Sequence, residues 1–319
     1  MRMHRALTVL AALAAAVPLT AAPAFPAVAT VSAAEPAAVA AVAAAGSAAG
    51  SVAVAAVDRL ARQAVPDSVA SWHADGGALV VSVVGKGDAA ADGFAAAARS
   101  VAGVPVRVVP GAERPVPFWD IKGGQPLYLG GTRCTIGYNA GDNSGGRYII
   151  TAGHCTNLGG SGTGIGGSLG PVGGSSFPGN DYGVIRVTST SAVSTPWITR
   201  HGAGPDIGVS SDTTPVNVGQ RVCFSGSTSG WRCGGVVRAV NVTVNYGDGN
   251  VVGGLISTSL CAQPGDSGGP VVGDPGAGLR APALGIISGG TTCGSSQTLF
   301  SQPVREILQA YGLRLYLAP

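Results

Sequence analysis

Short runs of apolar and β-branched residues, separated by clusters of Gly and Pro, fill the chain from about residue 121 onward. Such runs are typical of β-strands, and their spacing predicts an all-β barrel or sandwich. One helix is expected there, Pro303–Tyr311, because Pro suits a first helical turn and Gly312 suits a C-terminal stop. The expected strands are Tyr148–Thr151, Asp181–Val187, Gln220–Phe224, Cys233–Tyr246, Gly254–Leu260, Pro270–Val272 and Ala283–Ser288.

Residues 58–117 have a different pattern, which predicts a small α/β unit. Ala78–Val84 and Val104–Val109 are expected as strands, and the alanine-rich segment Ala89–Ala102 as a helix between them. Three prolines after residue 109 then interrupt regular structure. The preceding segment, Ala27–Ala56, is alanine-rich and of low complexity, so we expect a spacer that is either poorly packed or helical.

The N-terminus has the pattern of an export signal. Arg2 and Arg5 precede a short apolar run, Ala6–Val17, and Ala22-Pro23-Ala24 offers a small-residue cleavage site. The run is shorter than the roughly 20 residues that a membrane-spanning helix needs. We therefore expect residues 1–30 to be removed and the product to be secreted, with no membrane attachment after export.

Composition and charge exclude several classes of function. The chain has 52 Gly, 11% charged residues and a net charge of +3, and Lys86 and Lys122 are its only lysines. Without a concentrated basic face, we expect no nucleic-acid partner. Metal-ligand spacing such as C-x-x-C or H-E-x-x-H is absent, so we expect no metal and no cofactor.

Six cysteines follow the export signal, which predicts three disulfides. Spacing alone leaves fifteen connectivities open. The cysteines are Cys134, Cys155, Cys223, Cys233, Cys261 and Cys293.

The segment Gly265–Pro270 reads Gly-Asp-Ser-Gly-Gly-Pro and contains the candidate nucleophile, Ser267. It also fits the G-x-S-x-G pattern of α/β-hydrolases, but those folds place their histidine after the serine, and no histidine follows Ser267. The order here is His154, Asp181, Ser267, one of three known orders of the catalytic triad. His201 lies in a loop-like stretch and is interpreted as a surface histidine.

The chemistry of acyl transfer explains why a serine, a histidine and an aspartate occur together. A serine hydroxyl is a weak nucleophile and needs a base, which we assign to His154. Asp181, at the head of an apolar strand, would accept the second imidazole N–H and fix the tautomer. The glycines around Ser267 allow a tight turn that would direct the N–H groups of Gly265 and Ser267 at an oxyanion.

These motifs resemble the secreted bacterial chymotrypsin-fold serine proteases of the streptogrisin and α-lytic protease group. The resemblance spans about Ile121 to Leu317. Its strings are Gly131-Thr132-Arg133-Cys134, Thr151-Ala152-Gly153-His154-Cys155, Asn180-Asp181-Tyr182-Gly183, Val242-Thr243-Val244-Asn245-Tyr246, Cys261-Ala262-Gln263-Pro264-Gly265-Asp266-Ser267-Gly268-Gly269 and Gln302-Pro303-Val304.

The resemblance implies an all-β double antiparallel β-barrel with a C-terminal helix, preceded by a small α/β pro-region. The implied organisation is a signal peptide (1–30), a pro-region (31–120) that assists folding and inhibits until it is cleaved, and a protease domain (121–319). The mature N-terminus is expected between Phe118 and Ile121. The implied disulfides are Cys134–Cys155, Cys223–Cys233 and Cys261–Cys293.

The same resemblance implies a substrate pocket. Ser288, Gly289 and Gly290 would form one side, Ala262, Gln263 and Pro264 another, and Thr298 the far wall. None of these residues is charged, and Ile287 stands where glutamate-specific relatives carry a histidine. A buried charge needs a partner, so cleavage is predicted after medium or large apolar residues such as Leu, Phe or Tyr. The expected partners are protein or peptide substrates and the chain's own pro-region, and the expected state is a monomer.

One residue departs from the family pattern. Relatives carry an arginine after the first cysteine of the middle pair, and that arginine pairs with the aspartate of Gly-Asp-Ser-Gly; here Phe224 follows Cys223. Asp266 therefore needs another partner, either Arg221, Arg232 or Arg238, or backbone N–H groups. A non-catalytic binding protein and an esterase remain the alternatives to a peptidase, and the complete triad favours the peptidase.

Overall fold

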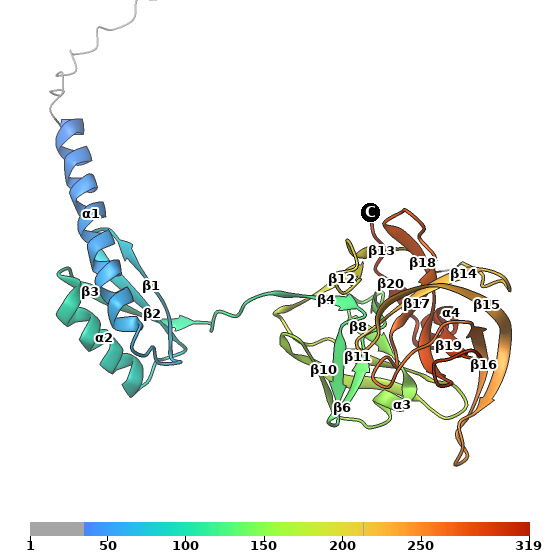
Figure 1. Ribbon diagram of the computed structural model, residues 1–319. Helices are drawn as coiled ribbons and strands as arrows, with labels where there is room; N and C mark the ends of the chain where they lie inside the picture. The colour runs from blue at the N-terminus through green and yellow to red at the C-terminus, as the bar shows by residue number, and fades with distance from the viewer. Residues whose placement is uncertain (1–34, 213) are drawn as a thin grey trace, which may run out of the picture. The chain divides into compact units, whose positions relative to one another are not determined.

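The structure, a computed structural model, describes residues 35–212 and 214–319. The predicted signal peptide (1–30) lies outside the described residues. The chain divides into two compact units, one ending at Pro115 and the other spanning Val116–Pro319 (Figure 1). Residues 116–120, which the sequence assigns to the pro-region, thus belong to the second unit. None of the helices in the described part of the chain combines the length and apolar character that a membrane span requires.

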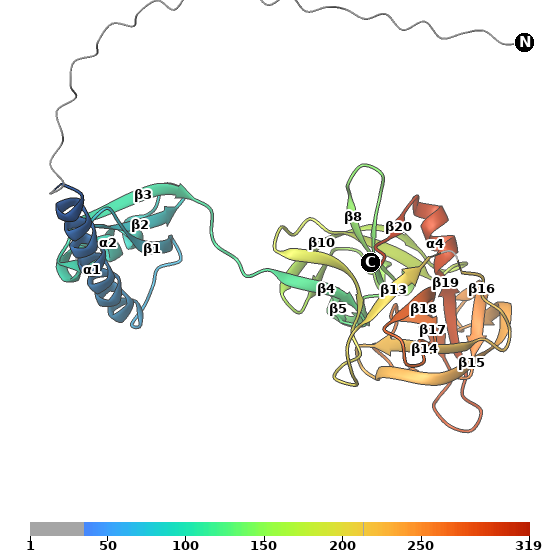
Figure 2. The ribbon, with the colours of Figure 1, turned by 90° about the horizontal axis from the view of Figure 1, so that it is seen from above.

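The first unit is a three-stranded sheet packed against two helices (Figures 1 and 2). Its elements are α1 (Glu35–Ala61), β1 (Val69–Asp75), β2 (Ala78–Val84), α2 (Ala89–Ala102) and β3 (Val106–Ala112). The central strand, β2, pairs with β1 in antiparallel and with β3 in parallel orientation. Its residues Leu79, Val81 and Val83 alternate along the strand, share one face and pack with Val57 of α1 and Phe94 of α2.

Capping explains why the helix α2 begins and ends where the sequence predicts. The Asp88 carboxylate accepts a hydrogen bond from the N–H of Ala91 at 2.8 Å, which satisfies an unpaired donor of the first turn. Gly103 follows the helix with φ of 65°, a left-handed conformation that glycine adopts without steric cost. The strand Ala78–Val84 also has its predicted bounds, whereas the third strand lies at Val106–Ala112 instead of Val104–Val109.

The second unit contains two sheets. The eight-stranded sheet has the order β20-β7-β8-β11-β10-β9-β5-β6. Its strands are β5 (Pro126–Leu129), β6 (Thr132–Thr135), β7 (Tyr138–Gly141), β8 (Arg147–Thr151), β9 (Ser161–Gly164), β10 (Gly167–Ser176), β11 (Tyr182–Arg186) and β20 (Arg314–Leu315). A one-turn helix, α3 (Gly153–Thr156), follows β8.

The nine-stranded sheet has the order β17-β14-β15-β16-β19-β18-β13-β12-β4, and a further β17–β18 pairing closes six of its strands into a barrel. The six strands of this barrel pair in antiparallel orientation, as expected. Two pairings that lie outside the closed barrel, β4 with β12 and β13 with β18, are parallel. The strands are β4 (Trp119–Gly123), β12 (Ala192–Ile198), β13 (Ile207–Ser211), β14 (Arg221–Gly226), β15 (Gly230–Asn245), β16 (Val251–Thr258), β17 (Pro270–Gly273), β18 (Arg280–Gly290) and β19 (Leu299–Pro303).

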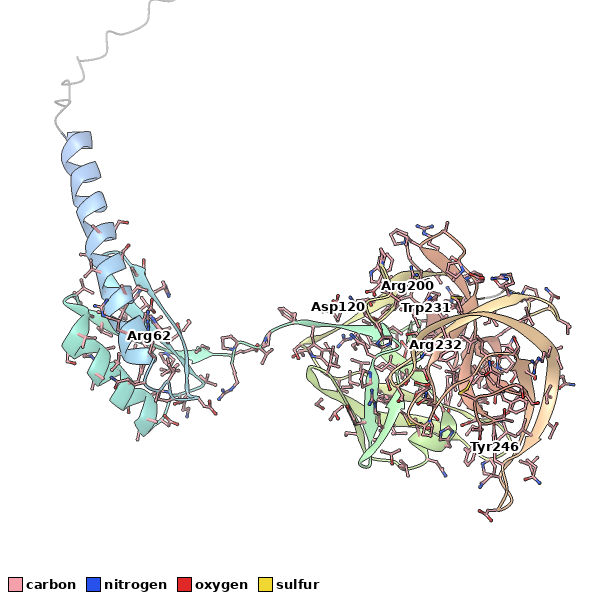
Figure 3. All side chains as sticks on the ribbon, in the orientation of Figure 1. Arg62, Asp120, Arg200, Trp231, Arg232 and Tyr246 are labelled. Atoms are coloured by element: carbon pink, nitrogen blue, oxygen red, sulfur yellow. A yellow bond between two sulfur atoms is a disulfide. The ribbon has the colours of Figure 1, made fainter. Side chains whose placement is uncertain are left out.

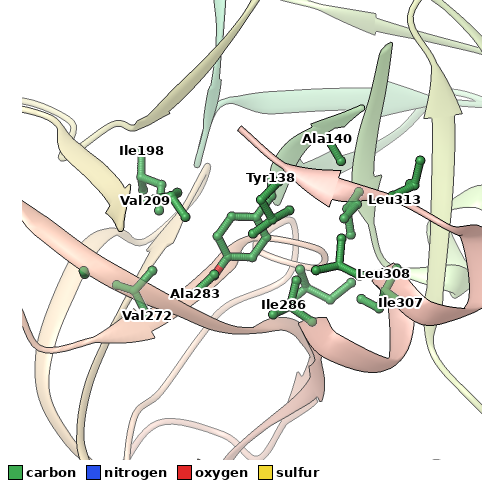
Figure 4. Close-up of a cluster of buried hydrophobic side chains, with 14 of the residues drawn as sticks. Tyr138, Ala140, Ile198, Val209, Val272, Ala283, Ile286, Ile307, Leu308 and Leu313 are labelled. Atoms are coloured by element: carbon green, nitrogen blue, oxygen red, sulfur yellow. The ribbon is translucent and has the colours of Figure 1, made fainter. Parts of the chain in front are cut away.

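Three apolar clusters stabilise this unit: one lies within the nine-stranded sheet, one is shared between the two sheets, and one lies mainly within the eight-stranded sheet, joined there by Ile121 of β4 and Ala192 of β12. The shared cluster brings Tyr138 of β7 together with Ile286 of β18 and Leu308 of the C-terminal helix, α4 (Val304–Tyr311) (Figure 4). The Tyr138 hydroxyl donates to the carbonyl of Val271 at 2.6 Å, so its one polar atom is satisfied inside the core. This cluster fixes the first sheet against the second, and the candidate site depends on that arrangement.

The N-terminal end of α4 differs by one residue from the prediction, and its C-terminal end lies at Tyr311 as predicted. Pro303 is the N-cap residue and the helix begins at Val304, while Gly312 ends it with φ of 64°. All seven predicted strands of this unit are present with shifted ends, for example Gly230–Asn245 instead of Cys233–Tyr246. The disulfides are Cys134–Cys155, Cys223–Cys233 and Cys261–Cys293, the pairs that the family resemblance implies.

Candidate active site

The position of His154 follows from the short helix α3 at the end of β8. The neighbouring Cys155 is bonded to Cys134 of β6, which restrains this turn. Gly153 is required here, because a Cβ atom would lie 2.7 Å from the backbone nitrogen of Tyr182. The imidazole is 32% exposed and its ring lies edge-on to that of Phe177, with centroids 5.9 Å apart. His154 is therefore rigidly placed but open to solvent on one side.

Asp181 immediately precedes β11 and faces His154. Its side chain is 1% exposed. One carboxylate oxygen, Oδ1, accepts the backbone N–H of His154 at 2.9 Å, and the other, Oδ2, lies 2.9 Å from Nδ1 of the imidazole. Because a carboxylate only accepts, Nδ1 carries the proton and Nε2 presents a lone pair. This is the tautomer that a general base requires.

Ser288 and Tyr246 extend this hydrogen-bond chain into the second sheet. The Ser288 hydroxyl donates a hydrogen bond to Oδ2 of Asp181 at 2.6 Å. Because its proton is used there, the Ser288 oxygen accepts a hydrogen bond from the Tyr246 hydroxyl, 3.0 Å away. Tyr246 lies just beyond β15, at the tip that joins β15 to β16 (Figure 3). Burial raises the pKa of Tyr246 to about 12, so this donor stays protonated over the physiological range.

The loop that carries Ser267 packs against the end of β8. The carbonyl of Ser267 accepts the N–H of Thr135 at 2.8 Å, and the N–H of Gly268 donates to the carbonyl of Ile287 at 2.7 Å. Gly268 has φ of 84°, and a Cβ atom there would overlap Thr151 Oγ1 and lie 2.8 Å from the nitrogen of Ala152. Ser267 therefore belongs to a turn whose backbone touches the residues just before His154.

Within the described residues, no hydrogen bond joins the Ser267 hydroxyl to His154. Such contacts are often long in unliganded enzymes and tighten when substrate binds. The structure thus brings His154 and Asp181 into direct contact, and brings the Ser267 turn against the same strand end. His201 is exposed, as expected.

Two backbone N–H groups beside Ser267 are unused. Gly265, with φ of 97°, and Ser267 itself donate no backbone hydrogen bond to any described residue, whereas the N–H of Asp266 between them donates to the carbonyl of Gln263 at 3.0 Å. Backbone N–H groups without an internal acceptor are available to bind an oxyanion. These are the two donors that the sequence assigned to that role.

Asp266 is satisfied by backbone N–H groups instead of an arginine. Its fully buried carboxylate accepts the N–H groups of Thr228, Ser229 and Gln263 at 2.8 to 2.9 Å, together with the Ser229 hydroxyl. Gly226 leaves room for it, because a Cβ atom there would overlap the carboxylate.

Two of the three candidate arginines have other partners. Arg221 pairs with Asp274 at 2.9 Å, and Arg238 donates to the carbonyl of Gln297 at 2.9 Å. Asp266 forms no ion pair with any described arginine. The structure therefore selects the second of the two alternatives that the sequence left open, in which backbone N–H groups replace the missing arginine.

A pocket of about 520 Å³ opens beside Ser267. It has no charged residue in its lining. Two expected lining residues are elsewhere: the Ser288 side chain is 4% exposed and contacts Asp181, and Thr298 lies outside the lining, where its hydroxyl accepts from Arg238 at 3.4 Å. The lining residues are Ala262, Gln263, Pro264, Ser267, Ile287, Gly289, Gly290, Thr291, Thr292 and Cys293. Thr291 and Thr292 were missed, although their place between the Gly289-Gly290 pair and Cys293 was a usable signal.

A model of the family described as "Trypsin" matches residues 121–310. The chain belongs to the trypsin family of serine proteases. It is 42% identical to Streptogrisin-A of Streptomyces griseus over 195 residues, which is 60% of this chain and 60% of that protein. It thus spans less than two thirds of that relative. The streptogrisin resemblance and the chymotrypsin-like fold predicted from the sequence are confirmed.

Two further proteins are similar over the second unit. Glutamyl endopeptidase 2 of Streptomyces griseus is 41% identical over 200 residues, 62% of this chain and 100% of that protein. The crystal structure of Nocardiopsis Protease (NAPase) is 38% identical with a TM-score of 0.55, and the match covers 62% of this chain and 100% of that one. The group therefore includes a protein named for glutamyl cleavage, so family membership alone leaves the substrate preference open.

Proposed function

We propose that this protein is a serine endopeptidase that cleaves peptide bonds through an acyl-enzyme on Ser267. The observation that carries the proposal is the buried Asp181 carboxylate bound to Nδ1 of His154, next to a serine turn with two unused N–H groups. This combination supplies a base, a nucleophile and a place for developing negative charge.

The proposed reaction has two halves. The Ser267 hydroxyl attacks the substrate carbonyl while Nε2 of His154 takes its proton, and the resulting oxyanion receives hydrogen bonds from the N–H groups of Gly265 and Ser267. One such donor is worth roughly 3–4 kcal/mol of transition-state stabilisation. His154 then gives the proton to the leaving amine. In the second half a water molecule loses a proton to His154 and attacks the acyl ester, and His154 returns that proton to the Ser267 oxygen as the carboxylic acid product leaves.

For the substrate preference, the proposal is cleavage after medium or large apolar residues such as Leu, Phe or Tyr. The uncharged lining of the pocket supports this, since a buried substrate charge without a partner is costly. Ile287 in the lining further disfavours a glutamate side chain. A peptide-library profile dominated by Lys or Glu at the position before the cut would contradict the preference and leave the peptidase activity intact.

The proposal also covers maturation. Residues 1–30 would direct export, residues 31–120 would act as a folding-assisting and inhibitory pro-region, and residues 121–319 would form the secreted, monomeric protease. Three disulfides in the second unit support an oxidising destination. N-terminal sequencing of the secreted product checks the boundary, and a start far from Phe118–Ile121 would contradict it.

The deciding experiment compares wild type, Ser267→Ala and Ser301→Ala with peptide and ester substrates. Ser301 is a matched control, because its buried hydroxyl lies in the same unit and has no hydrogen-bond partner within the described residues. Loss of peptide cleavage in Ser267→Ala, with retention in Ser301→Ala, is expected. If the wild-type protein hydrolyses esters but not peptides, it is an esterase. If it hydrolyses neither esters nor peptides, it is a binding protein.

A further inference from the structure

Gln302 is a buried amide that connects the two sheets of the second unit. It lies in β19 and is 0% exposed. Its Oε1 accepts the backbone N–H of Asp181 at 2.8 Å, across from the first sheet. Its Nε2 donates to Oε2 of Glu306, one turn into the C-terminal helix, at 2.6 Å. Both ends of the amide are therefore used, and the two partners require opposite polarity.

These partners fix the orientation of the amide. The N–H of Asp181 can only donate, and the Glu306 carboxylate only accepts when ionised. A glutamine that was flipped by 180° would direct its N–H₂ group at the N–H of Asp181 and its oxygen at the carboxylate, so both contacts would become repulsive. Among side chains of this length, Gln alone accepts at one branch and donates at the other without depending on a titratable proton.

Asp181, which lies next to the eight-stranded sheet, receives the hydrogen bonds by which the nine-stranded sheet positions the His154–Asp181 part of the site. Two hydrogen bonds from the second sheet end on this residue: Ser288 contacts its carboxylate, and Gln302 contacts its backbone N–H. Ser288 and Gln302 belong to the paired strands β18 and β19, in which Ile286 lies opposite Gln302. In the same strand β18, the carbonyl of Ile287 accepts a hydrogen bond from the N–H of Gly268, the residue after Ser267.

We propose that Gln302 is a positioning residue of the reaction, which keeps Asp181, and through it His154, in register with Ser267. The inference rests on the proposed function. Gln302 contacts no reacting atom, so its contribution is to the geometry in which His154 takes the proton from Ser267. A displacement of about 1 Å at such a site can cost on the order of 100-fold in rate.

The test uses Gln302→Leu, which has a similar volume and removes both hydrogen bonds. Its kcat per active site, with sites counted by a fluorophosphonate, is expected to fall about 10- to 100-fold, while KM changes by less than about threefold, because the pocket lies elsewhere. Leu299→Ala is the control. Leu299 is fully buried in the same strand, so its truncation destabilises the unit without touching Asp181. Its kcat per active site is expected to stay within about twofold of wild type.

A swapped pair separates positioning from general packing. Gln302→Glu alone places two carboxylates together and is expected to be as poor as Gln302→Leu. Adding Glu306→Gln restores both contacts: the new carboxylate at 302 accepts from the N–H of Asp181 as the wild-type oxygen does, and it accepts from the new amide at 306, which reverses the polarity of that second contact only. The double variant is expected to recover at least about tenfold in kcat over Gln302→Glu. A merely structural role would not produce this recovery.

Glu306→Leu covers the case in which the Gln302 variants do not fold. Glu306 is exposed, so its replacement leaves the apolar core untouched. Its loss frees the amide of Gln302 to rotate, so kcat is expected to fall in the same direction by a smaller factor. The inference is overturned if Gln302→Leu keeps the wild-type kcat, or if the swapped pair recovers no kcat over Gln302→Glu. If the Gln302 variants do not fold, an unchanged kcat in Glu306→Leu overturns it. Wild-type protein without Ser267-dependent hydrolysis would instead overturn the proposed function.

Discussion

Replacement of Asp266 by Asn tests whether backbone N–H groups substitute for the missing arginine beside Ser267. In the structure Oδ1 accepts the N–H groups of Thr228 and Ser229, and Oδ2 accepts the N–H of Gln263 and the Ser229 hydroxyl. An asparagine keeps the contacts of Oδ1 and can donate to the Ser229 oxygen. Its N–H₂ group, however, faces the N–H of Gln263, and that contact becomes repulsive.

The expected loss follows from the contacts that change. A hydrogen bond to a charged group contributes about 1.5–3 kcal/mol, and the N–H of Gln263 loses one entirely. The two bonds to Oδ1 become neutral and each weakens by up to about 1 kcal/mol. The total is about 3 kcal/mol, which lowers Tm by roughly 6–12 °C for a unit of this size. A shift of the turn that misplaces one oxyanion donor lowers kcat by about 100-fold.

The assay is a thermal scan at fixed rate in the Ser267→Ala background, which prevents self-digestion, with kcat measured in the active background. Asp274→Asn is the control, because Asp274 pairs at the surface with Arg221, whose side chain is 67% exposed. Such pairs contribute about 0–1 kcal/mol, so its Tm should fall by no more than about 4 °C. If Asp266→Asn behaves like this control in both Tm and kcat, the account of the buried carboxylate is refuted.

Three further predictions concern maturation, the serine turn and pH. Phe118 is 75% exposed and precedes β4, so Phe118→Asp should slow self-processing, visible as accumulated precursor by mass spectrometry; unchanged processing would exclude this bond. Gly268→Ala should abolish activity and lower Tm, because its Cβ would overlap Thr151 Oγ1; an active variant would show that the turn can relax. Partial desolvation of the carboxyl raises the pKa of Glu306 from its ordinary value, with the Gln302 hydrogen bond opposing this shift. The folded chain therefore keeps a proton that the unfolded chain releases, and stability should fall as pH rises through this window; Glu306→Gln should flatten that slope in urea titrations, and an unchanged slope would contradict the assignment.

Local residue composition was enough to predict part of the fold from the sequence. The helix Ala89–Ala102 has the bounds that its alanine-rich composition predicts, and in the structure Asp88 caps its start and Gly103 its end. The strand Ala78–Val84 is rich in apolar, β-branched residues, interrupted only by Ser82, and lies between turns, so it has the bounds that the sequence predicts. Short strands such as Ser161–Gly164 and the glycine-rich Gly167–Ser176 were missed. Their residues have little strand propensity, and only pairing with neighbouring strands gives them that conformation.

The candidate site shows the same division. Residue order was enough to name His154, Asp181 and Ser267, because few histidines exist in this chain and none follows the serine. The partners of Asp266 were not predictable, since three backbone N–H groups carry no signature in a sequence. In the sequence, Gln302 is visible only as part of the family motif Gln302-Pro303-Val304. Its role depends on Asp181, 121 positions earlier, and a contact of that range is created by the tertiary fold.

The most direct test of the central claim is the site at which a fluorophosphonate reacts. The account predicts one added phosphonyl group per molecule of mature protein, located at Ser267 by peptide mass spectrometry, with peptide hydrolysis lost in proportion. It also predicts that labelling is slowed by about 1000-fold or more in His154→Ala, where the base is missing. Stoichiometric labelling at another residue, or peptide hydrolysis that survives complete modification of Ser267, would contradict it.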